Sequence, residues 1–120
     1  MSDQDIRARG RAKMQEVYGF DVDPDGVPGG FVAMTVDHLF GQVWTRPGLD
    51  IEQRRLLTVG VLAALGQKAL LEVQFQSALR NGELTVEQVR EVVVHLTHYI
   101  GWPLATVLND AAETVIGRLG

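Results

Sequence analysis

Two histidines and a glutamate lie close together in the last third of the chain, at Glu91, His95 and His98. On a helix that turns about 100° per residue, the three side chains fall within an arc of about 60°. A carboxylate one turn from an imidazole can fix the tautomer of that ring, and an imidazole can donate or accept a proton near neutral pH. The spacing therefore indicates acid–base chemistry.

Two other interpretations of this face are open. The three groups could form the polar side of a surface helix and perform no chemistry. Two imidazoles within reach of each other could also bind a metal ion, but no motif supplies a further histidine or carboxylate to complete the ligand set. We therefore expect neither a metal site nor a cofactor.

The helix that carries these residues has clear start and stop signals. Thr85 and Gln88 form a capping box, in which each side chain satisfies a backbone amide of the other residue. Gly101 interrupts the helical pattern, and Pro103 suits the first turn of a following helix. The sequence predicts one helix over residues 86–100 and a last helix after it.

Helical periodicity also predicts the elements that hold this helix in place. We expect a single domain over residues 1–120, with an N-terminal helix at 1–18, a loop at 19–30 and a core at 31–117. Residues 56–65 are apolar on every side, which a helix tolerates only when neighbours cover each face. We place this helix at the centre of the core, with a buried strand as the alternative. The fold class is all-α.

Composition excludes several classes of function. The chain has 120 residues, 46% of them hydrophobic, and a formal charge of −4, which argues against general binding to nucleic acids or anionic membranes. It contains no cysteine, so disulfides, thiolate metal sites and thiol redox cycles are excluded. Neither a membrane span nor a signal-like N-terminus is recognisable, so we expect a soluble cytoplasmic protein.

Two weaker patterns lie near the N-terminus. Basic residues cluster at 7–13, where we expect a solvated helix face or one that pairs with the acidic groups of a neighbour, with an anionic docking site as the alternative. Residues 21–26 copy the first half of a calcium-binding loop, but the twelfth position is Val32 instead of glutamate, so we do not expect calcium binding.

Five stretches in the same order and spacing resemble the carboxymuconolactone decarboxylase family, at residues 40–50, 54–66, 78–82, 87–91 and 95–103. The resemblance covers about 39–116. It implies the all-α fold of the alkylhydroperoxidase D group, with about six helices, and self-association into a homotrimer or homohexamer. Pockets in this family lie between helices near subunit contacts, so the face of Glu91, His95 and His98 would line a pocket or an interface.

The family that the chain resembles includes proteins with two kinds of activity. The peroxidase branch uses a C-x-x-C pair, which a chain without cysteine cannot supply, so a thiol peroxidase is excluded. The decarboxylase branch usually has a histidine eight residues before the glycine of its Asn-Gly turn. In this chain that position is Gln74, which could donate a hydrogen bond to an enolate oxygen but cannot act as the acid.

The resemblance thus implies a lyase that decarboxylates or isomerises a small unsaturated lactone or related carboxylate without a cofactor. His95 or His98 would return the proton, and Glu91 would orient the imidazole. The candidate substrate-binding residues are Gln74, Arg55 as a carboxylate holder, Tyr99 and Trp102. The alternatives are a non-catalytic member that binds a small ligand or a protein, and a metal-dependent enzyme that uses His95 and His98.

Overall fold

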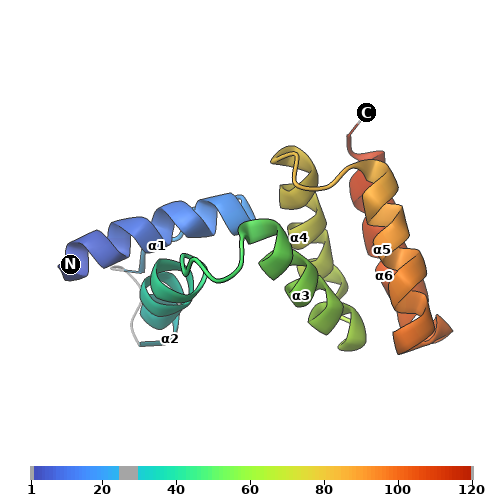
Figure 1. Cartoon of the computed structure of the whole chain (residues 1–120), viewed down its shortest axis with the longest axis horizontal. Helices are drawn as coiled ribbons and strands as arrows, with labels where there is room; N and C mark the ends of the chain where they lie inside the picture. Colours follow the sequence, from blue (N-terminus) through green and yellow to red (C-terminus); the bar gives the residue numbers. More distant parts are fainter. Residues whose placement is uncertain (1, 25–29, 120) are drawn as a thin grey trace. The chain divides into compact units, whose positions relative to one another are not determined.

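The computed structural model describes residues 2–24 and 30–119, and this part of the chain is all-α (Figure 1). It divides into two compact units, Met1–Ile51 and Glu52–Gly120, which we describe separately. The single domain therefore stays a prediction. The predicted loop at 19–30 and the calcium-like pattern at 21–26 fall partly on residues 25–29, outside the described residues. Within the described ranges, no helix combines the length and apolar character needed to cross a membrane.

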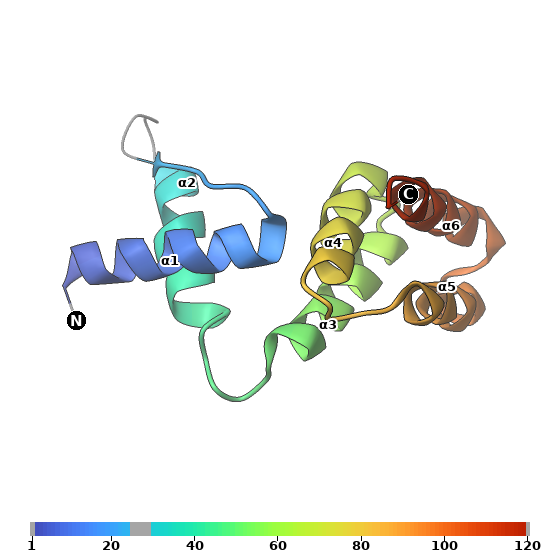
Figure 2. The same cartoon turned by 90° about the horizontal axis from the view of Figure 1, so that it is seen from above.

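The first unit consists of two helical segments that cross (Figure 2). Helix α1 spans Asp3–Tyr18, and the second segment consists of α2 (Gly30–Met34) and the π-helix η2 (Thr35–Val43). Helix α1 corresponds to the helix expected at 1–18, but the sequence did not indicate the wider π-helical turn of η2, in which the backbone N–H of Trp44 donates to the carbonyl of Leu39 over 2.9 Å. The core of this unit contains Met14, Val17, Val36, Phe40 and Trp44.

Glycines permit the close approach of α1 and η2. A Cβ atom added at Gly10 would lie 1.9 Å from the carbonyl oxygen of Val36, and one at Gly41 would lie 2.9 Å from that of Ile6. Without side chains at these positions the two backbones come near enough for Arg9 Nε to donate to the Gly41 carbonyl over 2.8 Å. The crossing thus depends on residues that have no Cβ.

Two arginines of α1 pair with acids of the same unit. Arg7 donates two hydrogen bonds to Asp37, and Arg11 donates two to Asp21. The hydrogen bonds from Arg7 hold the pKa of Asp37 below its usual value, because they stabilise the charged carboxylate. Arg7 and Arg11 of the basic cluster are therefore matched by acids within the unit, whereas pairing with a neighbour stays a prediction.

The second unit contains four helices, namely α3 (Ile51–Ala64, with its first residue in the first unit), α4 (Lys68–Arg80), α5 (Val86–Ile100) and α6 (Trp102–Gly117). Helix α6 packs against both α4 and α5. The core comprises Val59, Ala63, Leu71, Phe75, Val89, Val93, Leu108, Ala111, Ala112 and Val115.

The predicted start and end of α5 are confirmed. The backbone N–H of Gln88 donates to Thr85 Oγ1 over 3.1 Å, and the N–H of Thr85 donates to Gln88 Oε1 over 2.9 Å. Gly101 ends the helix with a φ of 88°, a left-handed value that glycine adopts at little cost.

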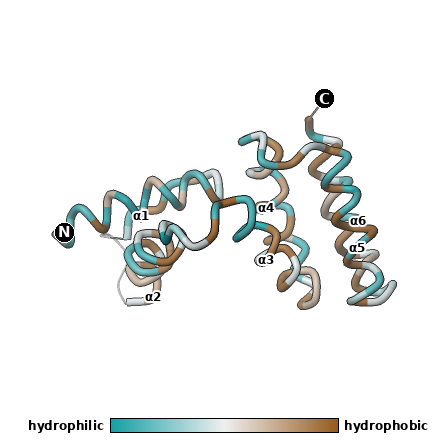
Figure 3. The backbone as a smooth tube through the Cα atoms, in the orientation of Figure 1, coloured by the Kyte–Doolittle hydropathy of each residue, from teal (hydrophilic) through white to brown (hydrophobic). Residues whose placement is uncertain are grey.

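The expectation that residues 56–65 lie at the centre of the core is wrong for the chain by itself. Val59 and Ala63 are buried, but Leu57, Val61 and Leu65 are 62%, 59% and 64% exposed. Figure 3 shows the hydrophobic residues along α3. The helix packs on one side only, because the chain provides no element over the opposite side within the described part of this unit.

The close approach of α1 and η2 at Gly10 leads to a testable prediction. We expect Gly10→Ala to destabilise the protein by about 1–3 kcal/mol or more, because the new methyl group overlaps the Val36 carbonyl. Gly60→Ala is the matched control, since it also replaces a helical glycine but meets no atom within 4 Å. It should stabilise α3 by up to about 1 kcal/mol. Thermal unfolding followed by circular dichroism tests both variants, and an unchanged midpoint for Gly10→Ala would contradict the crossing.

Candidate functional site

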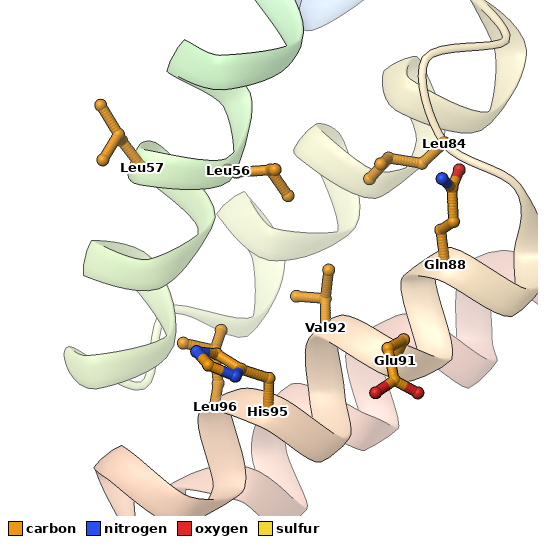
Figure 4. Close-up of a pocket in the computed structure, with 8 residues that line it drawn as sticks. All are labelled: Leu56, Leu57, Leu84, Gln88, Glu91, Val92, His95 and Leu96. Carbon is orange, nitrogen blue, oxygen red and sulfur yellow. The ribbon is translucent and has the colours of Figure 1, made fainter.

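A hollow of about 550 Å³ lies between α3 and α5 in the second unit (Figure 4). This volume lies within the range of small-molecule sites. Helix α3 contributes Leu56 and Leu57, and the segment before α5 contributes Leu84. Helix α5 supplies the remaining side chains, Gln88, Glu91, Val92, His95 and Leu96.

The walls of this hollow are mainly hydrocarbon. The polar lining residues are Gln88, Glu91 and His95, all on α5, and in the described part of the chain no arginine or lysine lines the hollow. The other lining residues are leucines and valine, which the sequence analysis did not identify as site residues. Leu56 and Leu57 are 43% and 62% exposed, whereas Leu84, Val92 and Leu96 are partly buried against the core, and neither property can be read from a sequence.

His95 and Glu91 lie on the same side of α5 without contacting each other. In Figure 4 the imidazole of His95 extends towards α3, whereas the carboxylate of Glu91 lies at the edge of α5. No hydrogen bond joins the two groups among the described residues. The ring of Tyr99, which is 78% exposed, lies beside the imidazole with a centroid distance of 5.1 Å.

His98 belongs to a different hollow. A groove of about 290 Å³ between α5 and α6 is lined by His98 and Trp102, together with Thr97, Asn109 and neighbouring apolar residues. His98 Nδ1 lies 2.8 Å from the Val94 carbonyl, and because a carbonyl can only accept, Nδ1 carries the hydrogen. The structure therefore brings Glu91 and His95 to one hollow and His98 and Trp102 to another.

A metal-dependent enzyme that uses His95 and His98 would need the two imidazoles to converge on one ion, but they line different hollows. Within residues 2–24 and 30–119, no group of three or more histidines and carboxylates is placed to hold a metal ion. The ligand set that a metal enzyme built on His95 and His98 would need is not assembled by this part of the chain.

Arg55 and Gln74 meet in a buried polar cluster. The guanidinium of Arg55 has no exposed surface and donates to both carboxylate oxygens of Glu83, over 2.9 and 2.8 Å. Its Nη1 donates to Gln74 Oε1 over 2.8 Å. Asn81 Nδ2 donates to the same carboxylate over 3.1 Å.

This cluster fixes one end of the hollow. It joins α3, α4 and the segment before α5, and its members Arg55 and Glu83 directly precede the lining residues Leu56 and Leu84. Neither Arg55 nor Gln74 lines the hollow itself. Sequence reasoning missed Glu83, because the partner of a buried arginine 28 residues away leaves no local signal.

The buried ion pair of Arg55 and Glu83 leads to a second prediction. Arg55→Met should lower the free energy of unfolding by about 3–5 kcal/mol, because it leaves the buried Glu83 carboxylate without its counter-ion. The double variant Arg55→Met, Glu83→Leu should recover much of that loss, since it removes both charges. Urea unfolding measures each value.

Arg90→Met is the control for this experiment. It breaks an exposed pair with Glu113 and should have little effect on stability. A double variant as unstable as the sum of its two single variants would contradict the role assigned to charge burial.

Sequence comparisons connect this site to known proteins. The chain is 36% identical over 81 residues to the 4-carboxymuconolactone decarboxylase of Acinetobacter baylyi, a match that covers 68% of the chain and 60% of that relative. It is 47% identical over 66 residues to the nitrosuccinic acid decarboxylase of Metarhizium robertsii, which covers 53% of the chain and 44% of the relative. The matches thus span about half of each curated relative. The model of the carboxymuconolactone decarboxylase family matches residues 29–114, and the chain therefore belongs to that family.

Proposed function

We propose that the protein is a decarboxylase that needs no cofactor and acts on a small carboxylate with an electron-accepting group next to the leaving carboxylate. An unsaturated lactone is such a group, and so is a nitro group. The observation that carries the proposal is the hollow between α3 and α5, which combines hydrocarbon walls with one imidazole. The two relatives support it, since both are named as decarboxylases.

The reaction consists of two steps. The bond between the substrate carbon and its carboxylate breaks, carbon dioxide leaves, and the electron pair moves into the acceptor to give an enolate or a nitronate. That anion then takes a proton on carbon from an imidazolium, and the imidazole recovers its proton from water. Atoms and charge balance without an oxidant or a reductant.

The apolar walls favour the first step. A carboxylate concentrates its charge on two oxygens, whereas the anion that remains spreads the charge over the acceptor. Contact with Leu56, Val92 and Leu96 removes water from the carboxylate and so destabilises the concentrated charge more than the spread one. The hydrocarbon lining therefore lowers the barrier to loss of carbon dioxide.

His95 is the proposed proton donor, because its ring lines the hollow and extends towards α3. His98 lines the groove between α5 and α6, which makes it the alternative donor. Glu91 lies at the same hollow as His95 and would orient the imidazole once a bound substrate brings the two groups closer. Arg55 and Gln74 act as positioning residues in this proposal, since their side chains bond within the buried cluster.

The third prediction tests this proton donor. His95→Gln should lower kcat by about 10²- to 10⁴-fold, because glutamine cannot supply the proton. In the parent protein kcat should fall as the pH is raised, since the donor must be protonated, and the variant should lack that fall. The measurement is carbon dioxide release above the uncatalysed rate from 4-carboxymuconolactone, nitrosuccinic acid and 2-nitrohexanoic acid.

His38→Gln is the control, because it removes an exposed histidine of the first unit. Loss of activity in His98→Gln with full activity in His95→Gln would move the site to the groove between α5 and α6. Full activity in both variants would overturn the proposed mechanism.

A non-catalytic ligand-binding protein is the second candidate function. Gln74 favours it, because this residue replaces the family's usual histidine and its side chain bonds to Arg55 in the buried cluster. This candidate predicts binding of the same acids without release of carbon dioxide.

We also propose that the chain self-associates, as a homotrimer or homohexamer. Leu57, Val61 and Leu65 follow one another every four residues and form an exposed apolar row along α3 and the residue after its end. A contiguous apolar patch of this kind is typical of an interface between protein chains. The resemblance to a family of oligomers supports the same conclusion.

The fourth prediction concerns this apolar row. Val61→Glu and Leu65→Glu should shift the molar mass measured by light scattering to that of smaller species, because a carboxylate cannot be buried without a partner. Neither residue lines the hollow, so an effect on mass is separable from a direct effect on ligand contacts. Gln76→Glu, on the exposed side of α4, should leave the mass unchanged. A parent protein with the mass of one chain would contradict the proposal.

A further inference from the structure

The cap of α5 holds the side-chain amide of Gln88 at the hollow between α3 and α5. Gln88 lines the hollow, and its Oε1 accepts a hydrogen bond from the backbone N–H of Thr85 over 2.9 Å. Because a backbone N–H can only donate, the amide atom that faces it is the oxygen. The Nε2 atom, with its two hydrogens, is therefore directed away from Thr85.

This nitrogen lies on the side of the hollow. In Figure 4 the Gln88 side chain extends from α5 to the level of Leu84, with its nitrogen turned towards the side of Leu56 and Val92 and its oxygen on the opposite side. Among the described residues, no protein atom accepts a hydrogen bond from Nε2. A ligand that brings an oxygen into this end of the hollow can therefore replace water as the acceptor.

The other polar side chains at the hollow have different chemistry. The Glu91 carboxylate can only accept when ionised and lies at the edge of α5, and His95 is the proton donor of the proposed reaction. Gln88 donates without losing its hydrogen and at any pH near neutral. Where hydrocarbon replaces water, a positioned donor of this kind stabilises negative charge that develops on a ligand oxygen.

Gln88 and His95 can act on the same small ligand. They are seven positions apart in the sequence and lie on the same side of α5. Two helical turns separate them, which is about 10 Å along the axis. A contact of about 3 Å at each end leaves space for the few atoms between an acceptor oxygen and the carbon that takes the proton.

We infer that Gln88 is a further binding residue of the hollow, and that its Nε2 donates a hydrogen bond to the oxygen of the substrate's electron-accepting group. A nitro oxygen and a lactone carbonyl both accept such a bond. The inference rests on the proposed function for its identification of the hollow as the substrate site. It gives the capping box a second role, because the contact that starts α5 also orients the donor.

The fifth prediction concerns Gln88→Glu, which keeps the cap and removes the donor. Glutamate is also typical of this capping-box position, so the variant should unfold at the temperature of the parent or above. The probe is 1-nitropentane, the product of decarboxylating 2-nitrohexanoic acid, which is uncharged at pH 7 and has oxygens that accept but do not donate. Its dissociation constant, measured by NMR titration of the full chain, should rise by about three- to tenfold through loss of one hydrogen bond.

Pentan-1-ol is the matched ligand for this experiment. It has the same five-carbon chain, but its hydroxyl can donate to a glutamate, so Gln88→Glu should not weaken its binding. In parent protein labelled with nitrogen-15, 1-nitropentane should also shift the side-chain N–H signals that Gln88→Glu lacks, since the inference requires direct contact.

Gln76→Glu is the control variant. It makes the same change of side chain and charge at an exposed position of α4 that does not line the hollow, and should leave both dissociation constants unchanged. The inference is overturned if 1-nitropentane does not bind the parent protein or binds Gln88→Glu equally tightly. It is also overturned if Gln88→Glu weakens the binding of pentan-1-ol to the same extent.

Failure of the proposed function gives a different result. The probe has no carboxylate to lose, so its binding reports on Gln88 whether or not the protein releases carbon dioxide. Binding that depends on Gln88, without release of carbon dioxide from 2-nitrohexanoic acid, would retain Gln88 as a ligand-binding residue and overturn the decarboxylase. Release of carbon dioxide together with 1-nitropentane binding that is unchanged in Gln88→Glu would retain the decarboxylase and overturn the inference.

Discussion

The buried charge of Arg55 constrains the whole second unit. A guanidinium without exposed surface is stable only when its donors and its charge are matched, and here Glu83 and Gln74 provide the match from α4 and the segment after it. One end of α3 is therefore tied to the chain that leads into α5. Because Leu56 and Leu84 directly follow the two charged residues, the same pair fixes one end of the hollow.

The buried charges of Arg55 and Glu83 are separate from the hydrocarbon walls of the hollow between α3 and α5. Arg55, which the sequence suggested as the holder of a substrate carboxylate, is instead buried in an ion pair with Glu83. The hollow is lined by leucines, valine, one glutamine, one glutamate and one histidine. The exposed row of α3 continues this apolar character beyond the hollow, at Val61 and Leu65.

Local signals predicted the helices well. Capping by Thr85 and Gln88 and the break at Gly101 each act over a few residues, and the corresponding ends of α5 are confirmed. The π-helical turn of η2 and the Gly10 crossing were not predicted. Both depend on how two segments meet, as the contact distance from Gly10 to the Val36 carbonyl shows, and no single stretch of sequence carries that information.

The sequence by itself determined the all-α class, the absence of thiol chemistry, the family and the face of α5 that carries Glu91, His95 and His98. The tertiary structure decided how that face is divided. His95 and His98 differ by about 60° around the helix axis, which is enough to turn one ring towards the hollow beside α3 and the other towards the groove beside α6. It also decided that Arg55 pairs with Glu83, because a buried ion pair forms between residues that only folding brings together.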